Sequence, residues 1–237
     1  MDGVKRILYK ISGESLGGYE GLYSKVELLR ICGDISKLHS IGVSVCIVVG
    51  GGNVLRGRSV KDFGIDRISG DYMGMLATVM NAISVQSVLE SEFKKKTTVM
   101  SSLRIDKACS YYNTREALSK LSNNEILIFA AGIGSPYFST DTGAAIRSAE
   151  MGCDLFIKGT TVDGVYSSDP KQSLDAVFYE HITYKEVISR DLMFMDRGAS
   201  MMLMESDISS IVFSIKVNKN PLNDLFFKGV KHTLITN

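Results

Sequence analysis

Short apolar runs alternate along the chain with longer segments in which apolar residues recur every three or four positions. This alternation predicts an α/β fold, a three-layer αβα sandwich with a mostly parallel central sheet. Several of the runs are apolar throughout, which is typical of parallel strands buried on both faces. The predicted strands are Val4–Ile11, Val43–Val49, Thr97–Met100, Ile126–Ala130, Leu155–Lys158 and Ile211–Ile215.

Helical periodicity predicts several helices between and after these strands. One begins after Ser24, which has the S-x-x-E spacing of a capping box with Glu27. Another begins near Tyr184, where Thr183 and Glu186 have the same spacing. The other predicted helices are at about Asp71–Glu92, at Arg115–Leu121 and at Thr142–Met151.

The predicted helix Asp71–Glu92 is apolar on more than one face. Met73, Leu76, Met80 and Ile83 share one face, and an adjoining face carries Val85, Val88 and Leu89. A helix that packs only on its own sheet needs a single apolar stripe. We therefore expect the helix to build a subunit interface at the face of Val88, and a helix buried wholly within its own subunit is the alternative.

The composition is that of an ordinary globular protein. The 237 residues are 45% hydrophobic and 22% charged, and 27 Lys plus Arg nearly balance 26 Asp plus Glu. A net charge of +1 provides no field for gripping a nucleic-acid backbone or an anionic membrane surface. No linker-like segment divides the chain, so a single domain is predicted over residues 1–237.

The cysteines and the N-terminus predict a cytoplasmic protein. Four cysteines are scattered without a C-x-x-C pair, as expected of reduced core residues. The first residues lack the apolar core of a signal peptide, and no apolar run reaches the roughly 18 residues that span a bilayer. The three histidines lack metal-ligand spacing, so no zinc site is predicted.

Three glycine-containing turns follow predicted strands and carry the candidate chemistry. They are Ser12-Gly13-Glu14, Gly50-Gly51-Gly52-Asn53 and Ala131-Gly132-Ile133-Gly134-Ser135. In open α/β sheets ligands bind at the carboxyl ends of strands, and glycine lets backbone amides approach a phosphate. Each turn alone is also consistent with a simple tight turn, but three on neighbouring strands predict an anion site.

The common phosphate-binding fingerprints are absent. The chain has no Gly-Lys dipeptide and therefore no P-loop, and Gly132-Ile133-Gly134 lacks the third glycine of G-x-G-x-x-G. Lys10, at the end of the first predicted strand, is placed to bring an ammonium group to a phosphate; a solvated charge is the alternative. Arg56 and Arg58 follow the second turn closely enough to meet the same anion.

Two predicted helix starts add candidate contacts. Asp71 stands at the start of the long helix, either as its N-cap or as a partner of a sugar hydroxyl, and the two roles are compatible. Thr140 and Asp141 precede the helix predicted from Thr142. The N-terminus of that helix would lie beside the third turn, as a second group that attracts anions.

With these motifs in order, the sequence resembles the bacterial uridylate (UMP) kinases of the amino-acid kinase superfamily, essentially from end to end. The first two turns and the stretch Val162–Pro170 have counterparts across the superfamily. The block Gly70–Asn81 is specific to UMP kinases and speaks against a kinase that phosphorylates a carboxylate. A non-catalytic nucleotide-binding protein on this fold is a further alternative, against which Lys10, Arg56 and Asp141 together argue.

The resemblance implies transfer of the γ-phosphate of ATP to UMP, giving UDP and ADP, with Mg²⁺ accompanying ATP. It also implies a homohexamer that GTP activates and UTP inhibits. The residues implied at the reacting phosphates are Lys10, Arg56, Asp141 and Asp196. Those implied at ATP are Lys10, Ile11, Ser12, Gly13, Gly52, Arg56, Thr160, Tyr166 and Asp169. Those implied at UMP are Gly51, Asp71, Ile133, Gly134, Ser135, Pro136, Tyr137, Phe138, Ser139 and Thr140.

Several positions depart from the pattern of the family. Ile133 and Ser135 stand where the family usually has Thr and Asn, so recognition of the base is expected to rely on backbone groups. Thr161 replaces a common lysine, and Ser214-Ile215 replaces an Asn-Met pair, near the implied ATP contacts. A UMP phosphate oxygen is already ionised near neutral pH, so the reaction needs no general base and the lack of a candidate histidine is no obstacle.

Overall fold

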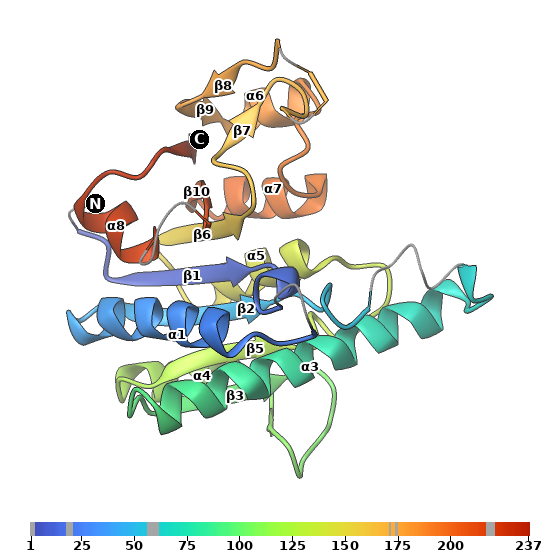
Figure 1. Ribbon diagram of the computed structural model, residues 1–237, viewed down its shortest axis with the longest axis vertical. Helices are drawn as coiled ribbons and strands as arrows, with labels where there is room; N and C mark the ends of the chain where they lie inside the picture. Colours follow the sequence, from blue (N-terminus) through green and yellow to red (C-terminus); the bar gives the residue numbers. More distant parts are fainter. Residues whose placement is uncertain (1–2, 18–20, 56–61, 171, 174, 217–220) are drawn as a thin grey trace.

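The computed structural model describes residues 3–17, 21–55, 62–170, 172–173, 175–216 and 221–237. Within these residues, nine strands form one sheet in the order β4-β3-β5-β2-β1-β6-β10-β11-β9 (Figure 1). Neighbouring strands are parallel except for β10 and β11, which confirms the predicted mostly parallel sheet. The strands are β1 (Arg6–Ile11), β2 (Ser44–Val49), β3 (Thr97–Ser101), β4 (Ser110–Tyr111), β5 (Ile126–Ala130), β6 (Leu155–Thr160), β9 (His181–Thr183), β10 (Ser209–Ser214) and β11 (His232–Thr236).

Alternate residues of the strands face two separate hydrophobic clusters, which explains the layered architecture. In β1, Ile7 and Ile11 belong to one cluster and Leu8 to the other. The first cluster is shared with α1 (Lys25–Ser40), α3 (Arg67–Ser91) and α8 (Pro221–Phe227). The second is shared with α4 (Thr114–Ser122), α5 (Thr140–Glu150), α6 (Tyr184–Ser189) and α7 (Arg197–Glu205). Helices therefore cover both faces of the sheet, and the predicted three-layer sandwich is confirmed.

Two shorter elements lie outside these layers. The 3₁₀ helix η1 (Gly13–Ser15) follows β1 directly. The strands β7 (Val165–Tyr166) and β8 (Phe178–Tyr179) form a separate antiparallel pair, which Figure 1 shows beyond the C-terminal part of the sheet. The predictions missed this pair, the edge strands β4 and β9, the strand β11 beside β9, and the helices α7 and α8.

Side-chain caps determine where two predicted helices begin. At α6 the capping box is complete, because the Thr183 N–H donates to Glu186 Oε2 (3.1 Å) and the Glu186 N–H donates to Thr183 Oγ1 (3.2 Å). At α1 the Glu27 N–H donates to Ser24 Oγ (3.4 Å), whereas the Glu27 carboxylate pairs with Arg30 (2.7 Å). Both starts are confirmed, but at α1 the Ser24 hydroxyl alone replaces the predicted box.

The long helix begins earlier than predicted. α3 starts at Arg67, and its N-cap is Asp66, whose carboxylate accepts a hydrogen bond from the Ser69 N–H (3.0 Å). Asp71 therefore lies inside the helix, and its interpretation as the N-cap is wrong. The first turn is polar, so a search for apolar periodicity does not detect it.

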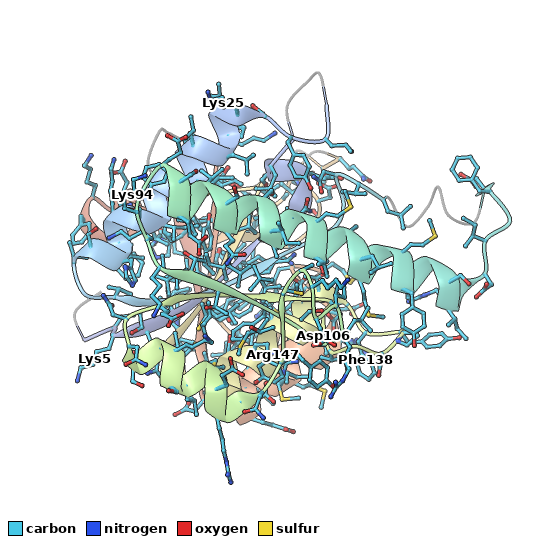
Figure 2. The ribbon with its side chains drawn as sticks, turned by 90° about the horizontal axis from the view of Figure 1, so that it is seen from below. Lys5, Lys25, Lys94, Asp106, Phe138 and Arg147 are labelled. Carbon is cyan, nitrogen blue, oxygen red and sulfur yellow. The ribbon has the colours of Figure 1, made fainter. Side chains whose placement is uncertain are left out.

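The surface that α3 leaves uncovered is not the predicted one. Val85 and Leu89 are fully buried and Val88 packs against the core, so the interface expected at Val88 is misplaced. The side chains on the opposite side are 36–48% exposed, and we call them the α3 stripe: Ile68, Tyr72, Met73, Leu76, Met80 and Ile83. Figure 2 shows α3 running along the molecular surface when the protein is seen from below.

The length and composition of α3 would also suffice for a membrane span. Within its apolar stretch of 18 residues, 44% is buried inside the protein. The sheet accounts for that buried side of the helix, because Val79, Ala82 and Val85 belong to the first hydrophobic cluster. The α3 stripe is thus the surplus apolar surface, and it lies on a helix that the fold already holds in place.

Candidate active site

The three predicted glycine turns lie next to one another. Strands β5, β2 and β1 are adjacent, and their register aligns Phe129 with Val48 and Val49 with Ile11. The turns that follow these strands therefore start at the same edge of the sheet, close to η1 and to the start of α5 (Figure 1). The prediction that they line one edge is confirmed.

The first two turns are packed against each other and against α3. A Cβ atom at Gly13 would lie only 2.7 Å from Asn53 Oδ1, so this close approach of the two turns requires glycine. The second turn is held by Asn81, a fully buried residue of α3. Its Nδ2 donates to Gly50 O (2.6 Å) and to Asn53 Oδ1 (2.7 Å).

The same helix anchors the third turn and the segment after it. Thr78 Oγ1 accepts a hydrogen bond from the Ala131 N–H (2.8 Å). Asp71 Oδ2 accepts one from the Tyr137 N–H (2.8 Å), and both Asp71 oxygens accept from Arg67 Nε (2.9 Å each). Asp71 and Tyr137, both predicted at UMP, are therefore brought together.

A lysine–aspartate–lysine trio occupies the point where β1, β6 and α5 meet. Lys10 Nζ lies 2.8 Å from Asp141 Oδ1, and Lys158 Nζ lies 2.6 Å from Asp141 Oδ2. The three side chains are only 12–13% exposed. One carboxylate cannot neutralise two ammonium groups, so the trio leaves an excess of positive charge in a largely buried place.

Burial and charge shift the pKa values within the trio. Burial by itself raises the pKa of Asp141, but the neighbouring Lys10 and Lys158 outweigh it and hold this pKa below its ordinary value. Burial also lowers the pKa of Lys158, helped by the charge of Lys10 and opposed by that of Asp141. Perturbed groups of this kind concentrate at functional sites.

Lys158 is a site residue that the sequence reasoning missed. It was interpreted as the last residue of a buried strand, whereas β6 continues to Thr160. The available signal was a lysine within an apolar run, because a buried ammonium group needs a charged partner. The register supplies what the sequence does not contain, since Lys158 pairs directly with Lys10.

The start of α5 places Asp141 in this trio. Ser139 is the N-cap, because its Oγ accepts from the Thr142 N–H (3.0 Å), and the helix begins at Thr140 rather than at the predicted Thr142. Thr140 and Asp141 therefore lie in the first turn of α5 and not before it. The predicted helix N-terminus at the third turn is present, one half-turn earlier in the sequence than expected.

Asp196 joins the starts of α5 and α7. Its Oδ1 accepts from the Ala199 N–H (2.9 Å), as the N-cap of α7, and from Thr142 Oγ1 (2.9 Å). Its Oδ2 accepts from Ser139 Oγ. The negative charge of Asp196 also raises the pKa of Lys158 and so opposes the lowering that burial causes. Asp196 therefore lies near the trio, and it has a structural role that the sequence reasoning did not assign.

A cavity of about 470 Å³ lies beside Lys158, lined mainly by the end of β6, by β7 and the residues that flank it, and by residues 191–194. Thr160, Tyr166 and Asp169, the three residues predicted around the ATP adenosine, all line it. The Tyr166 hydroxyl donates to Asp163 Oδ1 (2.6 Å), which fixes the aromatic ring at the cavity wall. The cavity and the trio share Lys158, so a molecule in the cavity can extend to the charged groups.

The remaining predicted residues lie in the turns or in the segment after the third turn. The first two turns and the end of β1 contain Ile11, Ser12, Gly13, Gly51 and Gly52. The third turn contains Ile133, Gly134 and Ser135. The segment after it contains Pro136, Tyr137 and Phe138, of which the last two are well exposed. Arg56 and Arg58 lie outside the described residues, so their contacts with an anion stay predictions.

The arrangement can bind and stabilise an anion with several charged oxygens. Lys10 and Lys158 supply positive charge from two adjacent strands, and the glycine turns supply backbone N–H groups at the same edge. The trio contains no neutral base placed to accept a proton. Its chemistry is therefore electrostatic, which suits the transfer of a group that carries its own negative charge.

Comparison with known proteins agrees with this geometry. The model of the amino acid kinase family matches residues 5–214. The uridylate kinase of Ehrlichia canis (strain Jake) is 45% identical over 212 residues, which are 89% of this chain and 86% of that relative. That of Ehrlichia ruminantium (strain Welgevonden) is 44% identical over 234 residues, 98% of this chain and 95% of the relative. The crystal structure of UMP kinase from Ureaplasma parvum, 34% identical, matches with a TM-score of 0.94 over 99% of both chains. The chain therefore belongs to the amino acid kinase family.

Proposed function

We propose that this chain transfers the γ-phosphate of ATP to UMP, giving ADP and UDP. The observation that carries the proposal is the Lys10–Asp141–Lys158 trio, which lies between a nucleotide-sized cavity and the third turn. The relatives named uridylate kinase and UMP kinase match almost the whole chain, which supports the choice of acceptor.

In this proposal the protein lowers the barrier by placing charge. The two ammonium groups of Lys10 and Lys158 meet the negative charge that spreads over the transferred group in the transition state. Asp141 holds both lysines in position and limits their mutual repulsion. No side chain has to remove a proton, because the attacking phosphate oxygen of UMP is ionised near neutral pH.

The two nucleotides are assigned to opposite sides of the trio. ATP would lie with its adenosine in the cavity of Thr160, Tyr166 and Asp169, and with its phosphates toward the first two turns. UMP would lie along the segment that Asp71 fixes at Tyr137. Both nucleotides then approach the trio with their phosphates, as an in-line transfer requires.

We propose that Mg²⁺ enters this site with ATP. Among the residues that the structure describes, no three His, Cys, Asp or Glu side chains gather to hold a metal, and Asp141 is engaged by two lysines. This donor set fits an ion held mainly by nucleotide phosphates and water, which is common for Mg²⁺. When bound, the ion neutralises charge on the β- and γ-phosphates.

We propose that the α3 stripe contacts a second copy of the chain. Six apolar side chains in a row on one helix form a surface that a monomer would leave in water, and two packed copies of the helix would cover it. Such a contact is one step toward the homohexamer implied by the resemblance. Activation by GTP and inhibition by UTP stay predictions from that resemblance.

The domain organisation and the location of the protein follow as parts of the same proposal. The described sheet contains strands from both ends of the chain, β1 and β11, which supports a single domain over residues 1–237. The four cysteines are all unpaired in the described structure, in keeping with a protein of the cytoplasm.

The proposal is tested by measuring ADP release with ATP, Mg²⁺ and one acceptor at a time. UMP is the expected acceptor, with CMP and dUMP as close competitors and aspartate, glutamate and carbamate as the acceptors of a carboxylate-directed kinase. Release that depends on a carboxylate and not on UMP would overturn the proposal. Calorimetric binding of ATP and UMP without any turnover would instead indicate the non-catalytic alternative.

A further inference from the structure

Arg147 is a buried cation that the proposed reaction does not use. It lies in α5 and is only 6% exposed. Its guanidinium stacks on the ring of Tyr112, 3.4 Å from the centroid, and pairs with the carboxylate of Glu150. The Tyr112 hydroxyl donates to the same carboxylate (2.7 Å). A buried guanidinium held between the Tyr112 ring and the Glu150 carboxylate has a fixed position, so its remaining contact is well defined.

That remaining contact leads to the third turn. Arg147 Nη2 donates to Ser102 Oγ (2.9 Å), and Ser102 Oγ donates to Gly132 O (2.8 Å). The direction of this relay is fixed by chemistry, because an arginine can only donate and the serine hydroxyl has a single hydrogen to give. The charge of Arg147 also polarises the hydroxyl and strengthens its bond to the turn.

The third turn rests on Ser102 at a second place. Gly134 has a φ of +82°, and a Cβ atom there would lie 2.9 Å from Ser102 O. Ser102 is itself tied to the strand before the turn, because its N–H donates to Ala130 O (3.1 Å). The backbone and the side chain of Ser102 thus both contact the third turn and fix its position relative to the sheet.

We propose that Arg147 is a positioning residue for the acceptor, acting through Ser102 on the turn Ala131–Ser135. The assignment of this turn to UMP rests on the proposed function. Ile133 and Ser135 offer no carboxamide or threonine hydroxyl to the base, so the turn presents mainly backbone groups. Recognition by backbone groups depends on where the turn lies, and the relay from Arg147 fixes Gly132 while Thr78 fixes Ala131.

Ser102→Ala and Tyr112→Phe provide a matched test in the full chain. Ser102→Ala removes the hydroxyl between Arg147 and Gly132 and leaves the buried Arg147–Glu150 pair intact. Tyr112→Phe removes a hydroxyl from the same cluster but keeps the ring under Arg147 and the link to Ser102. Ser102→Ala is expected to raise the KM for UMP about tenfold, with the KM for ATP within about twofold of wild type. Tyr112→Phe should leave both values near wild type.

Arg147→Lys extends the test to the cation itself. A lysine keeps the charge but has no planar fork with which to contact Glu150 and Ser102 together, so the same rise in the KM for UMP is expected. Its thermal unfolding is followed alongside, because a misfolded variant would lose both substrates equally. An unchanged KM for UMP in Ser102→Ala, or an equal rise for ATP, would overturn the proposal.

Amide hydrogen exchange separates this proposal from the choice of acceptor. In the substrate-free protein, residues 131–135 should exchange faster in Ser102→Ala than in Tyr112→Phe, since one hydrogen bond that holds the turn is lost. If the protein does not phosphorylate UMP but the exchange is faster in Ser102→Ala, the positioning role is supported and UMP is refuted as the acceptor. Equal exchange in the two variants would refute the positioning role whatever the acceptor is.

Discussion

Lys10 and Lys158 stand directly opposite each other on the parallel strands β1 and β6, and the carboxylate of Asp141 lies between their ammonium groups. Paired positions on neighbouring strands point to the same face of a sheet, so two cations are brought side by side by the register alone. Asp141 limits their repulsion without cancelling their charge. A phosphoryl group at this edge can therefore be met by two lysines at once.

Lys10→Ala should lower kcat by about a hundredfold or more, which corresponds to about 3 kcal/mol of lost electrostatic stabilisation. The loss should appear in kcat because the interaction strengthens as charge develops on the transferred group. Initial rates at saturating ATP and UMP measure it. Lys228→Ala is the control, since the side chain of Lys228 is 73% exposed and pairs with Asp224, four residues earlier in the chain. A Lys10→Ala enzyme with near-normal kcat would remove Lys10 from the reaction.

Activity should fall at a lower alkaline pH than the usual pKa of a lysine predicts. Burial, with the charge of Lys10, holds the pKa of Lys158 below its usual 10.5, and only the protonated amine carries the charge that the reaction uses. As the pH rises through this lowered pKa, the charge is lost and kcat decreases. The pH profile of kcat in saturating substrate measures the effect, and Lys158→Arg, which stays charged, should lack this decrease. A profile that is flat up to the usual lysine value contradicts the prediction.

Asp71→Asn should raise the KM for UMP by about tenfold or more, because a charge-assisted hydrogen bond of about 1.5–3 kcal/mol is lost. The KM for ATP should change little. Asparagine keeps an oxygen that can accept from the Tyr137 N–H, so the backbone contact of Asp71 is preserved. Asp66→Asn is the matched control on the same helix, since asparagine is an equally good N-cap. Equal changes in the two KM values would refute the acceptor role of Asp71.

Met80→Glu and Leu76→Glu should dissociate the assembled protein, because each places a charge in the apolar α3 stripe. Light scattering at micromolar concentration measures the change in mass. Val88→Glu should behave differently: Val88 packs on the core, so its substitution should lower the thermal unfolding temperature of the subunit. A wild-type protein that is a fully active monomer would contradict the proposed assembly. An oligomer that survives both stripe substitutions would show that the interface lies outside the α3 stripe.

The central part of the fold was predictable and its periphery was not. Runs such as Ile126–Ala130 are apolar at every position, which is typical of a strand buried on both faces. β4, β7 and β8 have two residues each, too few for any periodicity. α7 contains a run of methionines after a glycine, and its clearest signal, the N-cap Asp196, was interpreted only as a functional carboxylate.

The site was predictable where its chemistry is local in the sequence. The glycine turns, Lys10 and Asp141 each stand beside a strand or helix end that the pattern indicates. Lys158 depends on the register between β1 and β6, which no local pattern contains. The orientation of α3 has the same origin: both of its sides are apolar, and only the packing on the sheet determines that Val85 is buried and Met80 is exposed.

The contacts of α3 have a consequence for how the two substrates communicate. Thr78 holds the third turn and Asn81 the second, and these anchors lie about 4.5 Å apart along one helix axis. A subunit or effector that shifts α3 must move both turns by the same amount, so donor and acceptor affinities should change together while the spacing between the two nucleotides is kept. Loosening one anchor, as in Thr78→Val or Asn81→Leu, should instead uncouple the donor affinity from the acceptor affinity. Assembly of the subunits would then change the affinity for only one of the two substrates.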